Sequence, residues 1–251
     1  MPSFQYNSDL VNKPPVWRLE KPKTYFRRLK TGNADIDKVF GGIPYGLTIL
    51  SGPAGTGKSR FAQEIASYVS KNTKVLYVYA ESIIDALNFS VGSSENIFTA
   101  NYVQSRPKWE KAIEEILYLL NYTGAEMLII DSITTLFSET TKAVDEADIR
   151  GATFQIKEKI ESKIPVIGIS QIRGSGMFTY SAGGQAVDHA ADLLVYFNKI
   201  QGKIVNKKLE KSSTEYIWYL TIAKDKTGIA EQASKWQIVY NDELHLIHME
   251  D

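Results

Sequence analysis

The sequence predicts an α/β fold in which a mostly parallel central sheet is flanked by helices, with an antiparallel extension near the C-terminal end. Three observations favour this class. Apolar runs alternate with segments of helical spacing through residues 46–170, strand-like runs with little helix between them follow from residue 193, and 251 residues suffice to bury one large core. Apolar strands that alternate with helices are typical of parallel sheets covered on both faces.

Residues 1–28 are predicted to form a basic, Pro-containing arm. Four prolines interrupt any helix there, and between residues 1 and 30 seven Lys or Arg residues oppose two acidic ones, a net charge of +5. Such an arm could touch nucleic acid or an adjacent subunit, or it could lie as a solvated strap over its own core. Residues 29–251 are predicted to form that core.

The elements of the core are expected in alternating order. A short helix follows Thr31 or Asn33, either of which can cap it, and it closes at two glycines. Apolar runs then predict strands, and 3.6-residue periodicity predicts helices. In chain order these are a strand at 48–50, a helix after it, a strand at 75–80, helices at 83–91 and 106–122, a strand at 127–130, a helix at 143–162 and a strand at 165–170.

The last quarter of the chain is predicted to extend the sheet with antiparallel strands at 193–197, 216–222 and 236–240. Between the first two lies a lysine-rich connector. It is expected to be a solvated hairpin tip, with contact to DNA as the alternative. Its lysines are Lys199, Lys203, Lys207, Lys208 and Lys211.

Composition limits the classes of function. The 29 basic and 29 acidic residues balance, so overall charge gives no argument for nucleic-acid binding. The absence of cysteine excludes disulfides, zinc held by thiolates and thiol catalysis, and three histidines make a metal cluster unexpected. No apolar run approaches the ~20 residues of a membrane helix. Because no signal peptide is visible at the N-terminus, we expect a cytoplasmic protein without membrane contact.

A glycine-rich loop predicts nucleotide binding. Residues 52–59, GPAGTGKS, match G-x-x-x-x-G-K-[ST] and lie between a short apolar strand and a segment of helical spacing. Such a loop cradles phosphates on its backbone N–H groups, its lysine charge meets the β and γ phosphates, and its serine hydroxyl can bind Mg²⁺. We therefore expect ATP and Mg²⁺ as cofactors. The expected nucleotide contacts are Gly52, Pro53, Ala54, Gly55, Thr56, Gly57, Lys58, Ser59 and Arg60.

Three polar residues follow apolar strands, where an open α/β sheet binds its ligands. Asp131 fits a Walker B carboxylate that holds Mg²⁺ beside Ser59, or alternatively caps the next helix. Glu81 is placed to activate the attacking water, or is a surface residue at a helix start. Gln171 can bond a γ-phosphate oxygen or the water and report the nucleotide state. With Lys58, Glu81 and Gln171 form the predicted catalytic set.

Two segments beyond these strands suggest partners. The Gly-rich loop after Gln171 holds Arg173, Phe178 and Tyr180, which could bind single-stranded DNA by stacking and phosphate contact, or fold back onto the core. Lys224 and Lys226 project to the same side of a strand end. They could complete the site of a neighbouring subunit, as an arginine finger does, or lie in an exposed turn.

The ordered set GGIPYG, GPAGTGKS, YVYAES, LIIDS, GISQIRGSG, AGGQAVDHAADLLVYF and AKDKTG resembles the RecA/RadA/KaiC superfamily of P-loop ATPases over about residues 29–248. It looks most like stand-alone archaeal RadA paralogues and KaiC-like proteins, including versions carried by archaeal viruses. The resemblance implies a RecA-like ATPase core that forms rings or filaments with ATP at subunit interfaces. It also implies a catalytic role for Glu81, a sensor role for Gln171, a DNA-binding loop after it, and a trans-acting pair, Lys224 and Lys226.

The chain also departs from that family. Within these 251 residues we find neither a helix-hairpin-helix domain nor a second ATPase repeat, and the arm has no clear Phe-x-x-Ala motif, although Phe4 and Phe26 are candidates for a variant. We therefore expect an accessory role in recombination, repair or replication rather than strand exchange. The alternatives are a nucleotide-gated scaffold and a KaiC-like signalling ATPase, neither of which binds DNA.

Overall fold

The computed structural model describes residues 27–81, 94–103, 107–137, 146–160, 163–173, 180–205, 208–210, 215–230, 234–240 and 243–249. The expected helix at 83–91 and most of the basic arm lie outside these residues. Among the described helices, none has the length and hydropathy needed to cross a membrane.

Strands and helices largely alternate as far as residue 190, and the described residues beyond it form strands. The strands are β1 (Arg28–Leu29), β2 (Ile43–Pro44), β3 (Leu47–Gly52), β4 (Val75–Tyr79), β5 (Ile97–Asn101), β6 (Met127–Asp131), β7 (Val166–Arg173), β8 (Tyr180–Ser181), β9 (Leu193–Gln201), β10 (Lys203–Val205), β11 (Lys208–Glu210), β12 (Tyr216–Asp225), β13 (Lys235–Tyr240) and β14 (Leu244–Met249). The helices are α1 (Ala34–Phe40), α2 (Lys58–Val69), α4 (Trp109–Thr123), α5 (Ile133–Leu136), α6 (Glu146–Ile160) and α7 (Gln185–Ala190).

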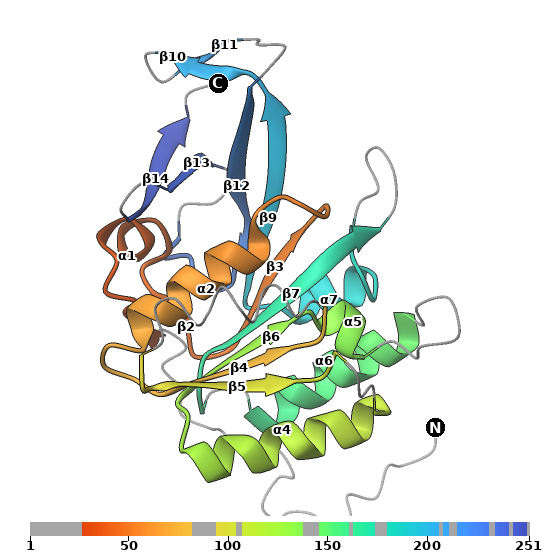
Figure 1. The fold of residues 1–251 in the computed structure, drawn as a ribbon. Coiled ribbons are helices and arrows are strands. Elements are labelled where there is room, and N and C mark those ends of the chain that lie inside the picture. The colour runs from red at the N-terminus through yellow and green to blue at the C-terminus, as the bar shows by residue number, and fades with distance from the viewer. Residues whose placement is uncertain are drawn as a thin grey trace, which may run out of the picture.

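One ten-stranded sheet organises the molecule in the order β14-β13-β12-β9-β3-β7-β6-β4-β5, with β8 paired to β7. All pairs from β9 to β5 along this order are parallel, and β9, β12, β13 and β14 pair antiparallel. The predicted α/β class and its antiparallel C-terminal extension are therefore confirmed. In Figure 1 the β9–β12 ribbon projects beyond the helices, with the β10–β11 hairpin at its tip.

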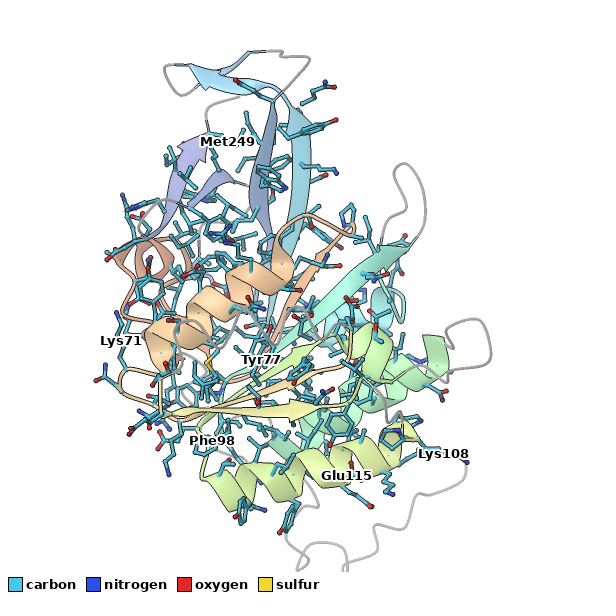
Figure 2. All side chains as sticks on the ribbon, viewed as in Figure 1. Lys71, Tyr77, Phe98, Lys108, Glu115 and Met249 are labelled. Atoms are coloured by element: carbon cyan, nitrogen blue, oxygen red, sulfur yellow. The ribbon has the colours of Figure 1, made fainter. Side chains whose placement is uncertain are left out.

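Each face of the sheet has its own hydrophobic core. Helices α1 and α2 pack on one face together with residues of the C-terminal strands, and helices α4, α5, α6 and α7 cover the other face. Side chains fill the space between sheet and helices on both sides (Figure 2). The strands between the two layers are nearly continuous apolar runs because both of their faces are buried.

Local signals set the helix ends. The Asn33 side chain accepts a hydrogen bond from the Ile36 N–H, so Asn33 caps α1, and Gly41 ends it with a left-handed φ of 71°. Helix α4 begins at Trp109, three residues later than the periodicity predicted, and the predicted start of α6 at residue 143 lies outside the described residues. Sequence analysis did not predict β5 and β14, the two edge strands of the sheet.

The register of the parallel strands brings the predicted polar residues to one edge of the sheet. Gly52 of β3 lies opposite Gln171 of β7, and Tyr79 of β4 lies opposite Asp131 of β6. Glu81 follows β4 by two residues, and the N–H of the intervening Ala80 donates to the Asp131 carbonyl. The carboxyl ends of four neighbouring strands therefore surround the loop that connects β3 to α2.

Arg28, the last residue of the expected arm, belongs to the packed structure. Its guanidinium donates to both carboxylate oxygens of Asp225 at 2.6 and 2.7 Å, and to the carbonyls of Phe40 and Gly42. The Arg28 and Asp225 side chains are 3% and 0% exposed. A buried ion pair thus joins β1 to the end of β12, 197 residues later in the chain.

Candidate nucleotide site at the strand ends

The glycine-rich loop connects β3 to α2, as predicted. Gly55 and Gly57 adopt left-handed φ values of 71° and 86°, which glycine reaches without steric cost. A Cβ on Gly52 would clash with the Phe197 carbonyl on the neighbouring strand β9. The glycines at these positions therefore allow the loop to turn tightly and to lie close against the sheet.

The lysine of the loop motif, Lys58, forms hydrogen bonds with backbone carbonyls of the loop itself. The Lys58 ammonium, in the first turn of α2, donates to the carbonyls of Gly52 and Pro53 at 2.9 and 2.7 Å. Lys58 is only 7% exposed. Burial lowers the pKa of Lys58, and the charges of Glu81 and Asp131 act in the opposite direction. The amine is therefore close to two carboxylates and bonded to backbone oxygens that a phosphate could replace.

Ser59 and Asp131 lie together, as the Walker B interpretation requires. The Ser59 hydroxyl donates to Asp131 Oδ1 at 3.2 Å, and the buried Tyr77 hydroxyl donates to Asp131 Oδ2 at 2.8 Å. The cap of the next helix is Ser132, whose side chain accepts from the Thr135 N–H, so the alternative of Asp131 as that cap is wrong. A hydroxyl and a carboxylate are oxygen ligands of the kind that Mg²⁺ takes alongside phosphates and water, so the residues fit this metal.

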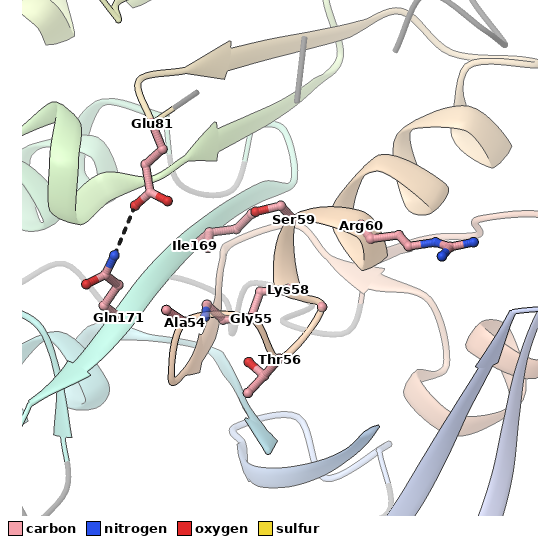
Figure 3. A pocket seen from close by; sticks show the side chains of 10 residues that line it. Ala54, Gly55, Thr56, Lys58, Ser59, Arg60, Glu81, Ile169 and Gln171 are labelled. Atoms are coloured by element: carbon pink, nitrogen blue, oxygen red, sulfur yellow. Dashed lines mark hydrogen bonds between the residues drawn. The ribbon is translucent and has the colours of Figure 1, made fainter. Parts of the chain in front are cut away.

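Glu81 and Gln171 also meet, on the far side of the loop from α2 (Figure 3). Glu81 Oε1 accepts from Gln171 Nε2 at 3.4 Å, from Thr135 Oγ1 at 2.9 Å and from the Ser132 hydroxyl. These bonds fix the orientation of the carboxylate. Sequence reasoning missed Tyr77, Ser132 and Thr135, and only the alternation of side chains along β4 could have placed Tyr77 next to Asp131.

These groups enclose a pocket of about 240 Å³. Its walls are the loop, the start of α2 and the ends of β4 and β7 (Figure 3). The lining residues are Ala54, Gly55, Thr56, Gly57, Lys58, Ser59, Arg60, Glu81, Ile169 and Gln171. Arg60 lies at the rim with its guanidinium 3.9 Å from the centre of the Tyr240 ring.

The antiparallel extension touches the loop from outside. The Trp218 indole N–H, on β12, donates to the Gly55 carbonyl at 3.3 Å, although the side chain is 43% exposed. This contact between the extension and the loop tip was not predicted, because it joins residues 163 positions apart in the chain.

The structure places the predicted DNA-binding residues only in part. Arg173 ends β7 and Tyr180 starts β8, and the two residues are opposite each other in an antiparallel pair. Tyr180 is partly buried. Phe178 lies outside the described residues. The base of the expected loop is therefore a short hairpin that continues directly from Gln171.

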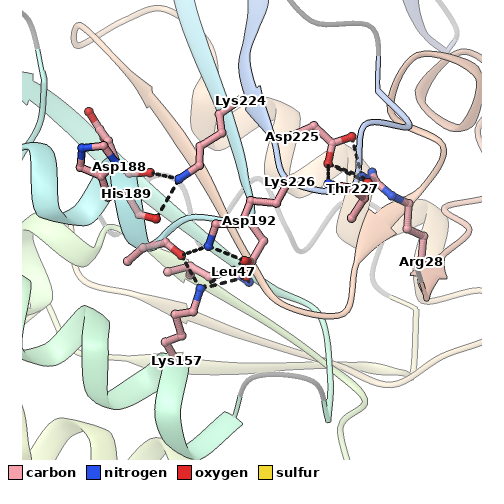
Figure 4. Close-up of polar contacts among 11 residues, drawn as sticks. Arg28, Leu47, Lys157, Asp188, His189, Asp192, Lys224, Asp225, Lys226 and Thr227 are labelled. Carbon is pink, nitrogen blue, oxygen red and sulfur yellow. Dashed lines mark hydrogen bonds and ion pairs between the residues drawn. The ribbon is translucent and has the colours of Figure 1, made fainter. Parts of the chain in front are cut away.

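Lys224 and Lys226 do not line the pocket of their own chain. At the end of β12, the Lys224 ammonium donates to the carbonyls of Asp188 and His189 at 2.9 and 2.8 Å (Figure 4). The Lys226 ammonium donates to Asp192 Oδ1 at 2.9 Å. Burial lowers the pKa of Lys224, as does the neighbouring charge of Lys226. Both lysines are therefore held at the C-terminal end of α7.

Two curated proteins are similar in sequence. The chain is 28% identical over 201 residues to the DNA repair protein RadA of Aquifex aeolicus and 23% identical over 188 residues to that of Streptococcus pneumoniae. The matches cover 75% and 73% of this chain but 43% of each relative, so the chain spans less than half the length of either. No protein-family model matches the chain.

A solved structure supports the fold. A KaiC-like protein of the archaeon Pyrococcus horikoshii superposes with a TM-score of 0.67 at 17% identity, over 89% of this chain and 99% of that one. The RadA relatives, this shared fold and the glycine-rich loop between β3 and α2 agree with one another. In sequence and fold the chain is therefore similar to the RecA/RadA/KaiC superfamily of P-loop ATPases.

Proposed function

We propose that the protein binds and hydrolyses ATP with Mg²⁺ at the pocket beside the β3–α2 loop. The observation that supports this most is the convergence of two pairs of side chains on that loop. Ser59 lies 3.2 Å from Asp131, and Gln171 lies 3.4 Å from Glu81, with the four residues drawn from different elements. A phosphate loop with a metal-binding pair on one side and a carboxylate–amide pair on the other fits phosphoryl transfer to water.

Binding would exchange one set of bonds at Lys58 for another. Its ammonium now bonds the Gly52 and Pro53 carbonyls, which are neutral acceptors. The β and γ phosphates are charged acceptors and form stronger bonds with an ammonium group. Ser59 and Asp131 would hold Mg²⁺, which offsets phosphate charge. The Tyr77 hydroxyl keeps the Asp131 carboxylate oriented.

Glu81 is the proposed general base, and Gln171 the proposed sensor of the γ-phosphate. Hydrogen bonds from Ser132 and Thr135 fix the Glu81 carboxylate at the edge of the pocket, where it can accept a proton from water. Gln171 connects the pocket to the segment that contains Arg173 and Tyr180, because it lies two residues before the end of β7. If Gln171 loses a hydrogen bond to the γ-phosphate on hydrolysis, its movement would therefore shift that segment.

We further propose that the protein acts as a homo-oligomeric ring or filament on single-stranded DNA, in an accessory recombination, repair or replication role. Lys224 and Lys226 would then act on the nucleotide of a neighbouring copy. The name of the two curated relatives, DNA repair protein RadA, supports the DNA part of this proposal. Arg173 and Tyr180, at the base of the loop after β7, support it as well, because a cation and an aromatic ring suit phosphate and base.

The rate of ATP hydrolysis with and without single-stranded DNA, measured across salt concentrations, tests the proposal. Stimulation by DNA that fades with added salt is the expected result, because phosphate contacts release counterions. Hydrolysis that DNA leaves unchanged would instead indicate a nucleotide-gated scaffold, which zero net charge favours, or a KaiC-like signalling ATPase. Light scattering with and without ATP would show whether copies assemble.

A further inference from the structure

Two lysines from different elements share the same acceptors beside α7. Lys157 of α6 donates to the Ala190 carbonyl at 2.6 Å and to Asp192 Oδ1 at 3.1 Å. Lys226 donates to the Ala190 carbonyl at 3.4 Å and to Asp192 Oδ1 at 2.9 Å. Figure 4 shows both ammonium groups directed at Asp192. The Asp192 carboxylate and the Ala190 carbonyl at the end of α7 therefore each accept hydrogen bonds from two lysines.

Asp192 is fixed by the sheet as well as by the lysines. Its Oδ2 accepts from the Leu47 N–H at 3.0 Å, at the start of the strand that leads into the phosphate loop. A Cβ on Gly46 would lie 2.6 Å from that oxygen, so the glycine leaves room for the carboxylate. Burial alone would raise the pKa of Asp192, but the Leu47 N–H, Lys226 and Lys157 hold it below its ordinary value. The surrounding N–H group and lysines thus favour the charged form of Asp192.

Lys157 and Lys226 differ in how freely their side chains can move away from Asp192. The Lys157 side chain is 18% exposed, and the Lys226 side chain is 41% exposed. The backbone of residue 226 is held separately, because its N–H donates to the Asp192 carbonyl at 2.9 Å. Arg28 also anchors the preceding Asp225. The Lys226 ammonium can therefore move while the strand end stays in place.

We propose that Lys157 is a positioning residue for Lys226, and that it stays on Asp192 and the Ala190 carbonyl when Lys226 leaves them for phosphate bound by a neighbouring copy of the chain. This inference rests on the proposed trans role of Lys226. Without Lys157, departure of Lys226 would leave a largely buried carboxylate with neither of the two lysines bonded to it, which is unfavourable. With Lys157 in place, the carboxylate remains paired, and repulsion between the two ammonium groups weakens the hold on Lys226.

Removal of Lys157 tests the proposal by the rate of ATP hydrolysis in the assembled protein. In Lys157→Met, Lys226 is the one lysine of the pair that still neutralises Asp192, so it is held there more tightly and leaves less readily. We therefore expect turnover to fall about tenfold, which corresponds to the strengthening of one charged hydrogen bond. The affinity for a fluorescent ATP analogue, measured at a dilution that favours single copies, should stay within about twofold. Lys159→Met is the matched control, since Lys159 is an exposed lysine of the same helix.

Two combined variants distinguish positioning from a merely structural role. In Lys157→Met/Asp192→Asn the tether on Lys226 is weakened, so turnover should recover most of the loss. In Lys157→Met/Lys226→Ala the loss should equal that of Lys226→Ala alone, because Lys157 acts through Lys226. Additive losses, no recovery with Asp192→Asn, or unchanged turnover in Lys157→Met would each overturn the inference.

The same set of variants separates this inference from the proposed function. If Lys226→Ala alone leaves turnover unchanged, the trans role has failed and the inference falls with it. If Lys226→Ala lowers turnover but Lys157→Met does not, the trans role stands and only the positioning role is wrong. Thermal unfolding of each variant shows whether it folds, and the double variant with Asp192→Asn keeps the test decisive if Lys157→Met is unstable.

Discussion

The phosphate pocket and the lysine cluster at the end of α7 differ in how complete they are within one chain. Around the pocket, side chains from the first turn of α2 and from three neighbouring strand ends already contact one another or the loop. They are Lys58 and Ser59 of α2, with Asp131, Glu81 and Gln171 at the ends of β6, β4 and β7. In the cluster, Lys224 and Lys226 donate to carbonyls and a carboxylate of their own chain and do not line its pocket. Folding alone assembles the first region, whereas the proposed task of the second requires another copy.

The largest effect on ATP hydrolysis is expected from Lys58→Ala, which alters the phosphate pocket, the region that is complete in one chain. Loss of the ammonium removes the charge that faces the phosphates, so ATP hydrolysis should fall by roughly 100-fold or more. The melting temperature of the nucleotide-free protein should change little, because burial of the charged amine is itself unfavourable. Turnover assays and thermal unfolding check this, with exposed Lys38→Ala as control. Near-normal turnover would contradict the site.

Glu81→Gln should separate binding from chemistry within the same pocket. The amide keeps the size of the side chain but cannot accept a proton, so turnover should fall by about 100-fold or more while ATP still binds. Single-turnover assays and binding of a fluorescent ATP analogue measure the two properties. Glu126→Gln, which removes an exposed carboxylate at the opposite end of β6, is the matched control. Unchanged hydrolysis would remove Glu81 from the mechanism.

Lys226→Ala sharpens the contrast between the regions, because its effect should depend on the neighbouring copy. Turnover should fall about tenfold, while nucleotide affinity of a single copy should not change. A mixture of Lys226→Ala and Lys58→Ala proteins should hydrolyse ATP faster than either protein alone, since the Lys58→Ala copies still offer Lys226 to intact pockets. A mixture no faster than its components would show that Lys226 does not act in trans.

The smallest effect is expected from Tyr77→Phe. This change removes the hydroxyl that donates to Asp131 Oδ2 at 2.8 Å and should cost about 1 kcal/mol of unfolding free energy. The Mg²⁺ concentration for half-maximal turnover should rise several-fold, because an outer hydrogen bond no longer orients a metal ligand. Denaturant unfolding and Mg²⁺ titration measure these effects, with exposed Tyr118→Phe for comparison. An unchanged Mg²⁺ requirement would separate Tyr77 from the site.

Sequence patterns could predict that these side chains meet beside the β3–α2 loop, because their positions obey local rules. A glycine-rich motif fixes the loop, and each polar residue directly after an apolar strand must emerge at the same sheet edge, as Asp131 and Glu81 do. Partners such as Trp218 on Gly55 could not be predicted, because a register between distant strands brings them together. The edge strand β5 was missed because its residues are partly exposed and lack a buried apolar run.

The buried position of Arg28 could not be predicted for a related reason. In a proline-containing basic segment, an arginine gives no local sign that it will be buried, and only Asp225, 197 residues away, explains its position. The contacts of the lysine cluster at the end of α7 likewise depend on residues that are distant in the sequence. Lys157 belongs to a helix whose apolar spacing was predicted correctly, but nothing in that spacing indicates that its charge meets Asp192.

The Arg28–Asp225 ion pair also dictates where the protein can be shortened. Asp225 separates Lys224 from Lys226 in the sequence, so the arginine that neutralises it secures the backbone on which both lysines stand. A chain that starts at residue 27 keeps this ion pair. One that starts at residue 30 removes the cation from a fully buried carboxylate, which keeps its hydrogen bonds from Thr227 and Ala230, and loss of such a cation typically costs about 3–5 kcal/mol. Removal of residues 27–29 would therefore loosen the end of β12, which carries Lys224 and Lys226.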